Sequence, residues 1–148
     1  MELTAKMKSS DSTPGNVLVV EDDALLALSI EDVLRDGGIS EVSVCPTIAL
    51  AMDAIDRSLP DAIILDVHLA DRNDGWALAE VVSCLRPDHP QIIFSTAAPE
   101  EIPPDVAKLG TIFEKPYDPS MLLDALRSNE VRGLFSRFRN AWGAPTTQ

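Results

Sequence analysis

The sequence is short of positive charge and of long apolar runs, and each shortage excludes a class of protein. Its 148 residues carry 12 Lys and Arg against 24 Asp and Glu, which gives a formal net charge of −12 at pH 7. A surface that binds nucleic acid needs clustered basic residues to displace counterions from the phosphates, so we expect no nucleic-acid partner. No apolar run approaches the roughly 18 residues that suggest a membrane span, so we expect none.

Cysteines, targeting signals and phosphate-binding loops are equally scarce. The two cysteines, Cys45 and Cys84, stand in apolar segments without the spacing of metal ligands, and we expect buried, reduced thiols. Residues 1–15 lack the apolar core of a signal peptide, which predicts a cytoplasmic location. The sequence has no Gly-rich P-loop, which argues against a nucleotide triphosphatase.

What the sequence does contain is a repeated alternation of short apolar runs with longer segments of helical period. The short runs, rich in β-branched residues, are 17–20, 42–44, 62–65, 92–94 and 111–113. Runs without polar alternation are typical of parallel strands buried on both faces. We therefore predict an α/β fold: a five-stranded parallel sheet, doubly wound by helices, in a flavodoxin-like (βα)5 three-layer sandwich.

Capping and helix-breaking residues mark the boundaries of these elements. Thr47 is a suitable helix N-cap, and Gly37-Gly38 can end the first helix in a left-handed turn. Prolines at positions 99, 103 and 104 crowd the fourth helical segment, so we expect only 104–109 to be helical and this segment to be short or mobile.

The sequence predicts three parts of the chain. Residues 1–15 are expected to form a flexible leader and 16–130 the folded domain. Residues 131–148 are basic and apolar at once, and helical spacing of their large side chains allows an extension of the last helix. A partner-docking helix or a frayed tail are the alternatives for this segment.

Polar residues follow four of the five predicted strands at their carboxyl ends, where ligands of parallel α/β sheets bind. They are Glu21, Asp22 and Asp23, then Asp66, then Ser95 and Thr96, and finally Glu114, Lys115 and Pro116. Clustered carboxylates raise one another's proton affinity unless a cation intervenes, and hard oxygen ligands suit Mg²⁺. With the charge neutralised by the ion and a lysine, one carboxylate can attack phosphorus while a threonine hydroxyl binds a phosphoryl oxygen. The chemistry predicted is the phosphorylation of an aspartate.

In order and spacing these motifs resemble the receiver domain of two-component response regulators. Asp22 and Asp66 lie 44 residues apart, Asp66 and Thr96 lie 30 apart, and Lys115 follows Thr96 by 19. The resemblance covers about residues 16–130 and includes the Asp74-Gly75 pair. It implies a single-domain response regulator that accepts a phosphoryl group from a histidine kinase or a phosphotransfer protein and then switches a protein–protein interaction. Such a protein is not a conventional enzyme, although it catalyses its own phosphorylation and autodephosphorylation.

The resemblance also implies roles for individual residues. Asp66 is the expected phosphoacceptor, Thr96 the hydroxyl that turns toward the phosphoryl group, and Lys115 the cation that pairs with it. Ser95 is the alternative to Thr96 if the register shifts by one. The peptide bond between Lys115 and Pro116 is expected to be cis, which fits the general preference of cis bonds for X–Pro.

The expected metal site holds Mg²⁺. Asp22 is the direct ligand and Glu21 acts through water, while Asp66 and the backbone carbonyl of His68 complete the protein ligands. Asp23 is expected to cap the first helix instead. The His68 side chain can influence the access of water to an acyl phosphate, and His89, beside a proline, is expected in a surface loop.

Several positions depart from the family pattern. The aromatic switch residue falls on Ile112, which is aliphatic, and the adjacent Phe113 should point to the other face of its strand. Ala70 stands where a proline is common, and the loop that follows is one residue longer than usual. We expect an intact site with an unusual readout. The sequences of residues 94–97 and 114–119 most resemble those of receivers that pair with HWE-type kinases in alphaproteobacterial stress signalling.

The sequence also allows alternative functions. A pseudo-receiver would be an interaction module without phosphate turnover. A haloacid-dehalogenase-like phosphatase or a toprim-type nuclease would need a second acid two residues after Asp66, where His68 stands. The downstream target is unknown, and we expect a monomer or a weak dimer.

Overall fold

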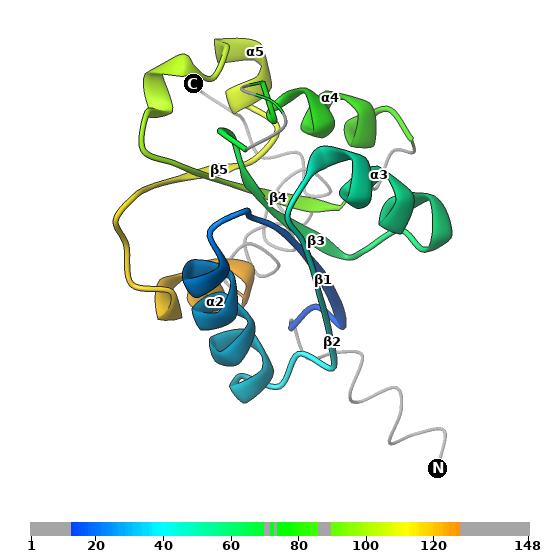
Figure 1. Ribbon diagram of the computed structural model, residues 1–148, viewed down its shortest axis with the longest axis vertical. Coiled ribbons are helices and arrows are strands. Elements are labelled where there is room, and N and C mark those ends of the chain that lie inside the picture. The colour runs from blue at the N-terminus through cyan, green and yellow to red at the C-terminus, as the bar shows by residue number, and fades with distance from the viewer. Residues whose placement is uncertain (1–12, 70–71, 73, 86–89, 128–148) are drawn as a thin grey trace, which may run out of the picture.

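The computed structural model describes residues 13–69, 72, 74–85 and 90–127. They form one sheet whose strands are all parallel and follow the order β2-β1-β3-β4-β5. The strands are β1 (Asn16–Val20), β2 (Glu41–Cys45), β3 (Ala62–Asp66), β4 (Gln91–Thr96) and β5 (Thr111–Glu114). The predicted five-stranded, doubly wound sheet is therefore confirmed (Figure 1).

Helices cover both faces of the sheet (Figure 1). On one face lie α2 (Ala24–Asp36) and the helical residues 120–127, whose apolar side chains pack on β1, β3 and β4. On the other face lie α3 (Ile48–Arg57), α4 (Ala77–Ser83) and α5 (Pro104–Ala107), with the short 3-10 helix η1 (Pro99–Glu101) before α5. Two cores thus hold the three layers together, because each buried strand presents alternate side chains to opposite faces.

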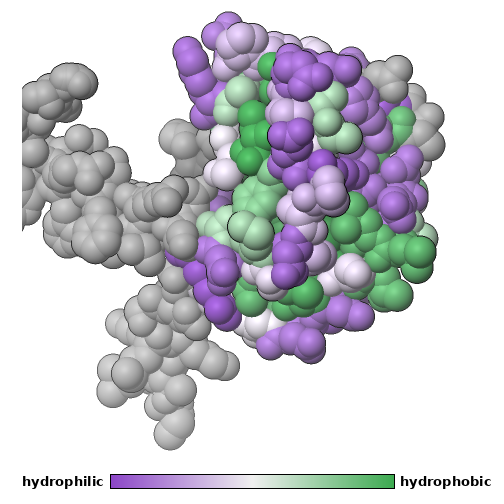
Figure 2. Space-filling model, turned by 90° about the vertical axis from the view of Figure 1, so that its left-hand side faces the viewer, coloured by the Kyte–Doolittle hydropathy of each residue, from purple (hydrophilic) through white to green (hydrophobic). Residues whose placement is uncertain are grey.

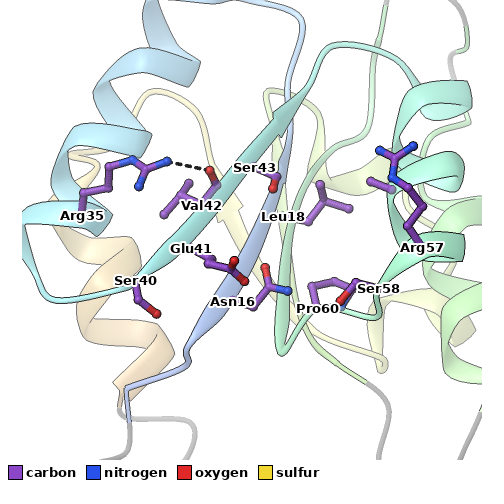
Figure 3. Close-up of a pocket in the computed structure, with 11 residues that line it drawn as sticks. Asn16, Leu18, Arg35, Ser40, Glu41, Val42, Ser43, Arg57, Ser58 and Pro60 are labelled. Atoms are coloured by element: carbon purple, nitrogen blue, oxygen red, sulfur yellow. Dashed lines mark hydrogen bonds between the residues drawn. The ribbon is translucent and has the colours of Figure 1, made fainter.

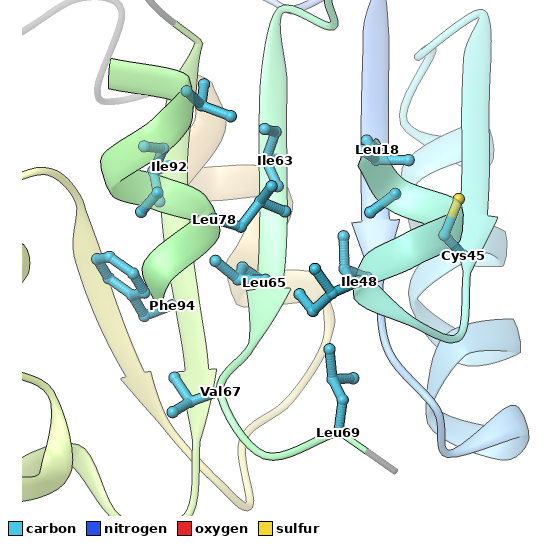
Figure 4. Packing of buried hydrophobic residues seen from close by; sticks show 14 of the residues in the cluster. Leu18, Cys45, Ile48, Ile63, Leu65, Val67, Leu69, Leu78, Ile92 and Phe94 are labelled. Carbon is cyan, nitrogen blue, oxygen red and sulfur yellow. The ribbon is translucent and has the colours of Figure 1, made fainter. Parts of the chain in front are cut away.

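The core beneath α3 and α4 shows how this alternation works (Figure 4). Ile63 and Leu65 of β3 point to this side, and Phe94 of β4 packs beside them while remaining fully buried. Leu78 of α4, the helix that covers this part of the sheet, packs in the same buried cluster. These side chains fix the carboxyl ends of β3 and β4 next to each other, which is the place where Asp66 and Thr96 stand.

Local sequence signals account for the helix boundaries. Asp23 caps α2, since its Oδ1 accepts the backbone N–H groups of Leu25 and Leu26. Thr47 caps α3 in the same way, as predicted. Gly38 has a φ of 99°, a left-handed conformation that suits glycine just after the end of α2.

Three predictions need correction. Burial on both faces is wrong for the outer strands, because β2 and β5 each have one neighbouring strand and leave Val44 and Ile112 more than a third exposed. A buried thiol is wrong for Cys84, which lies exposed just after α4, whereas Cys45 is buried. The fourth helix is short, as predicted, but α5 ends at Ala107, two residues before the expected end.

Large apolar side chains also reach the surface. Figure 2 shows green apolar patches between hydrophilic residues on one side of the molecule. Leu25 is 80% exposed, and the other large exposed apolar side chains among the described residues are Leu28, Val44, Leu50, Met52, Val81, Leu85, Ile112 and Met121. Within the described ranges, no helix is long and apolar enough to cross a membrane. Residues 1–12 of the expected leader, the tail 131–148, Ala70 and His89 lie outside the described residues.

Candidate phosphorylation site

The candidate site is built on a row of side chains across the carboxyl ends of the strands. Asp66 ends β3 and is the register partner of Ser95 on β4. Ile64 and Ile93, two residues earlier on each strand, pack into the core on the α2 side. Because side chains two residues apart share a face of a strand, Asp66 and Ser95 also face the α2 side.

Three carboxylates meet at this edge of the sheet. Glu21, Asp22 and Asp66 each offer an oxygen, and these oxygens all lie within 4.8 Å of one another. Glu21 and Asp66 are 3% and 4% exposed, whereas Asp22 is open to solvent. The site therefore holds two buried carboxylates and an accessible third one at its mouth.

Lys115 supplies the positive charge that faces these acids. Its Nζ lies 3.0 Å from Glu21 Oε1 and 3.3 Å from Asp66 Oδ2. The lysine directly follows β5, and its backbone N–H donates to the carbonyl oxygen of Thr96 at 2.8 Å. The peptide bond between Lys115 and Pro116 is cis. The side chain thus reaches from β5 across β4 to acids that stand on β3 and after β1.

Backbone N–H groups hold the second oxygen of each buried carboxylate. The amide of His68 donates to Asp66 Oδ1 at 3.1 Å, and the amide of Asp23 donates to Glu21 Oε2 at 3.1 Å. Both carboxylates therefore have one oxygen on a backbone amide and the other on Lys115. Such two-sided fixation leaves the Asp66 carboxylate in one orientation at the edge of the sheet.

The electrostatics reflect this crowding of like charges. The pKa of Glu21 rises from 4.5 to about 7, chiefly through burial and further through the Asp66 carboxylate, against the opposing effects of the Asp23 amide and Lys115. Burial alone would lower the pKa of Lys115, but the Glu21 and Asp66 carboxylates outweigh it and raise the pKa above its ordinary value. Burial is thus the main cause of the Glu21 shift, whereas the two neighbouring carboxylates cause the Lys115 shift.

The two hydroxyl residues at the end of β4 have different partners. Thr96 is fully buried, and its Oγ1 accepts the backbone N–H of Ala98 at 2.9 Å. Ser95 is also buried, and its Oγ lies 2.7 Å from the hydroxyl of Tyr117. Tyr117 was not among the residues expected from the sequence. The one signal that could have indicated it is a hydroxylated aromatic residue placed directly after the Lys-Pro pair.

Ile112, the residue expected at the aromatic switch position, lies on the other face of β5 from Phe113. Ile112 is 36% exposed, while Phe113 packs into the core on the α2 side. The ring of Phe113 meets that of Tyr117 edge-to-face, with centroids 5.4 Å apart and planes at 78°. The aromatic contacts near the site therefore lie on the face that also carries Asp66.

The His68 side chain lies outside this cluster. Its Nε2 is 2.8 Å from Glu101 Oε1, which joins the loop after β3 to η1. The two side chains are 37% and 55% exposed, so the contact contributes little to stability.

Comparison with known proteins identifies the family. The pattern of the response regulator receiver domain matches residues 17–127. The chain belongs to this family. The solution structure of the receiver domain of the Erythrobacter litoralis PhyR response regulator superposes with a TM-score of 0.69 at 26% identity, covering 84% of this chain and 93% of that one. The structure of the PhyR stress response regulator gives a TM-score of 0.61 at 26% identity, over 84% of this chain and 49% of that one.

Curated relatives match over a shorter stretch. A protein-glutamate methylesterase/protein-glutamine glutaminase of Xanthomonas oryzae pv. oryzae is 40% identical over 76 residues, which are 51% of this chain and 21% of that protein. The chain spans about a fifth of the length of the curated relatives it matches. Their enzymatic names therefore describe proteins far longer than the matched receiver portion.

The acid cluster of this receiver domain fits the metal ion that receiver domains generally bind. When all three carboxylates are ionised, they and the Lys115 ammonium leave two uncompensated negative charges, which a divalent cation would balance. Carboxylate oxygens are the ligands that Mg²⁺ prefers, and the exposed Asp22 leaves room for the waters that Mg²⁺ retains. Glu21, Asp22 and Asp66 are therefore suited to hold it.

A pocket of about 440 Å³ lies elsewhere, beside the edge strand β2 (Figure 3). Side chains of β1, β2, α2 and α3 line it, and none of the acid-cluster residues is among those described there. Within it Arg35 donates from Nη2 to the carbonyl oxygen of Val42 at 2.9 Å and from Nε to Glu31 at 3.0 Å. Arg35 thus bonds a backbone carbonyl of the edge strand, and the pocket is separate from the acid cluster.

Proposed function

We propose that this receiver domain accepts a phosphoryl group on Asp66, with Mg²⁺ as cofactor, and relays a signal through the resulting change of state. The observation that carries the proposal is the Lys115 ammonium, which contacts both Glu21 and Asp66 at the edge of a buried acid cluster. The family match over residues 17–127, a range that includes all three residues, supports the proposal.

The proposed reaction is a transfer between two side chains. An oxygen of the Asp66 carboxylate attacks the phosphorus of a phosphohistidine on the donor protein, so a P–O bond forms as the P–N bond breaks. The electron pair of the P–N bond returns to the imidazole, which takes up a proton. The product is a mixed anhydride on Asp66, and attack by water on its phosphorus later releases inorganic phosphate.

The chain's own groups contribute mainly by position and charge. The amide of His68 orients the Asp66 carboxylate, and Lys115 is in place to neutralise charge on the phosphoryl group as it arrives. Thr96, at the end of β4, is proposed to give up its bond to the Ala98 amide and to bond a phosphoryl oxygen. Bound Mg²⁺ supplies further charge neutralisation at the phosphoryl oxygens, and Glu21, Asp22, Asp66 and the His68 carbonyl are its proposed ligands.

We further propose that residues 16–130 form the receiver unit and that its output is a protein–protein interaction. The donor is a histidine kinase or a phosphotransfer protein. The resemblance at residues 94–97 and 114–119 favours a kinase of the HWE type, and the 26% identity to PhyR, which is named a stress response regulator, fits a role in stress signalling. Because Ile112 stands where an aromatic side chain is usual in the family, we propose that the change of state does not use the rotation of an aromatic ring at this position.

Incubation with Mg²⁺ and acetyl phosphate tests the central step. Intact mass spectrometry should show a gain of one phosphoryl group that is stable in acid and is removed by hydroxylamine. The variant Asp66→Asn should show no gain. The matched control Asp53→Asn, which changes an exposed acid of α3, should behave as the wild type does.

The same experiment separates the alternatives. A pseudo-receiver would gain no phosphoryl group in any variant. A phosphohydrolase would release phosphate over many cycles without accumulating the modified form. Equal phosphorylation of wild type and Asp66→Asn would disprove the assignment of Asp66.

A further inference from the structure

Ser95 and Tyr117 form a hydroxyl pair next to the proposed site, where Ser95 stands level with Asp66 on the neighbouring strand. Ser95 is 1% exposed and is the register partner of Asp66 on one side and of Phe113 on the other. Its Oγ lies 2.7 Å from Tyr117 Oη. A buried hydroxyl without a partner is costly, and here each hydroxyl satisfies the other.

This pair ties down the segment that carries Lys115. The backbone N–H of Lys115 donates to the carbonyl oxygen of Thr96, and two residues later Tyr117 bonds the side chain of Ser95. Residues 115–117 are thus attached to two consecutive residues of β4, once through the backbone and once through side chains. The edge-to-face contact with Phe113 fixes the tyrosine ring from the β5 side.

The path of the lysine side chain makes this attachment relevant to the reaction. Because β4 lies between β5 and β3, the stem of Lys115 has to pass over β4 before its Nζ reaches Asp66. Ser95 is the residue of β4 that stands level with Asp66. The Ser95–Tyr117 pair therefore lies beside the stem of Lys115. Burial raises the pKa of Tyr117, and Lys115, Glu21 and Asp66 all act on it electrostatically, as expected for a hydroxyl close to the acid cluster.

We propose that Tyr117, acting through Ser95, is a positioning residue for phosphoryl transfer: it holds Lys115 over Asp66. This inference rests on the function proposed above. It assigns Tyr117 no contact with the phosphoryl group. Its hydroxyl fixes the segment 115–117, so that the ammonium stays in reach of Asp66 without being reordered during the reaction.

Tyr117→Phe is the sharpest variant, because it removes one oxygen and keeps the ring that contacts Phe113. We expect the maximal rate of phosphorylation by acetyl phosphate to fall about tenfold, with the half-saturating donor concentration unchanged. Ser95→Ala should give the same loss, and the double variant should be no slower than either single one. Thermal unfolding of each variant shows whether the fold is retained.

The dependence on Lys115 separates positioning from a general structural effect. In a Lys115→Met background, Tyr117→Phe should change the rate no further, because the group that it positions is gone. If Tyr117→Phe slows the reaction equally in both backgrounds, or leaves the rate of the otherwise unchanged protein intact, the inference is overturned while Asp66 phosphorylation stands. Absence of phosphorylation in the wild type would instead contradict the proposed function.

A second measurement needs no phosphorylation. The sequence has four lysines, so the side-chain ammonium signal of Lys115 can be assigned by nitrogen-15 NMR with single substitutions. Tyr117→Phe and Ser95→Ala should both increase the mobility of this ammonium group. An unchanged Lys115 signal in both folded variants would contradict the positioning role.

Discussion

Lys115 Nζ lies 3.0 Å from Glu21 and 3.3 Å from Asp66, so a single ammonium group is shared by two buried carboxylates. Each partner stands on a different segment of the sheet edge: Glu21 follows β1, Asp66 ends β3 and Lys115 follows β5. The contact therefore joins three segments that are far apart in the sequence. One positive charge balances only one of the two carboxylates. A substitution at Lys115 or at either acid should therefore affect the stability of the fold and, in the proposed function, metal binding and reactivity as well.

Removal of the shared ammonium should weaken the fold as well as the reaction. Lys115→Met leaves Glu21 and Asp66 buried without their counter-charge, and we expect the free energy of unfolding at pH 7 without metal to fall by about 1–3 kcal/mol. Urea denaturation measures this. Lys108→Met is the matched control, since Lys108 is 79% exposed and lies 3.9 Å from Asp105. It should stay within about 0.5 kcal/mol of the wild type, and equal losses in the two variants would refute the prediction.

The raised pKa of Glu21 predicts how stability depends on pH in the absence of metal. The pKa is about 7 in the folded protein against 4.5 for the free group, so the folded state binds more protons than the unfolded state between these values. Stability contributed by this group is therefore highest at low pH and falls as the pH rises toward and through about 7. Urea denaturation in EDTA between about pH 5 and about pH 8 measures the slope.

Glu21→Gln is the control for this pH dependence, because the amide keeps the shape but does not titrate. The decline in the free energy of unfolding across the same pH range should become shallower in the variant. An unchanged slope would show that another group dominates the titration.

The fold could be predicted from the sequence because the buried strands carry their own signal. Apolar runs such as 62–65 need no knowledge of their neighbours, since both faces of β3 are covered. The exposure of Val44 on β2 could not be predicted in this way, because it depends on β2 being an edge strand, which is a property of the sheet order. Likewise Cys84 stands in an apolar segment, yet α4 ends just before it and leaves it exposed.

In the candidate site, too, some contacts could be predicted from the sequence and others could not. The convergence of Glu21, Asp66 and Lys115 follows from the rule that parallel strands end at one edge of the sheet, so spacing along the chain was enough to predict it. The contact between Ser95 and Tyr117 could not be predicted, because it depends on the direction that the chain takes after Pro116. The bond from His68 to Glu101 depends in the same way on how η1 is placed.

Asp22 should matter for metal binding far more than for stability. Its side chain is exposed, whereas its cluster partners Glu21 and Asp66 are buried. We expect Asp22→Asn to weaken Mg²⁺ binding at least about tenfold by calorimetry, since it removes a charged oxygen ligand. Without metal, its free energy of unfolding should lie within about 0.5 kcal/mol of the wild type.

Asp23→Asn is a matched control for Asp22→Asn, because asparagine also caps helices and the neighbouring Asp23 has its Oδ1 on two backbone amides of α2. Its Mg²⁺ affinity should stay close to that of the wild type. If Asp23→Asn weakens binding as much as Asp22→Asn does, the general charge of the loop, and not Asp22 itself, determines the affinity.

Gly75 lets α4 begin directly above the loop that follows Asp66. Its backbone N–H donates to the carbonyl oxygen of Val67 at 3.0 Å, and an added Cβ would lie 2.7 Å from the carbonyl oxygen of Asp66 and 2.9 Å from that of Val67. Gly75→Ala must therefore shift this backbone, and we expect a loss of about 1–3 kcal/mol in the free energy of unfolding. Phosphorylation by acetyl phosphate should slow as well, because the shifted atoms belong to the residue that we propose as the phosphoacceptor.

Gly15→Ala is the matched control, since among the described residues its added Cβ would meet Asp61 Oδ2 at 3.5 Å, an ordinary contact. If both variants unfold at the same urea concentration, the close approach at Gly75 does not limit the stability of the fold, and the prediction is wrong.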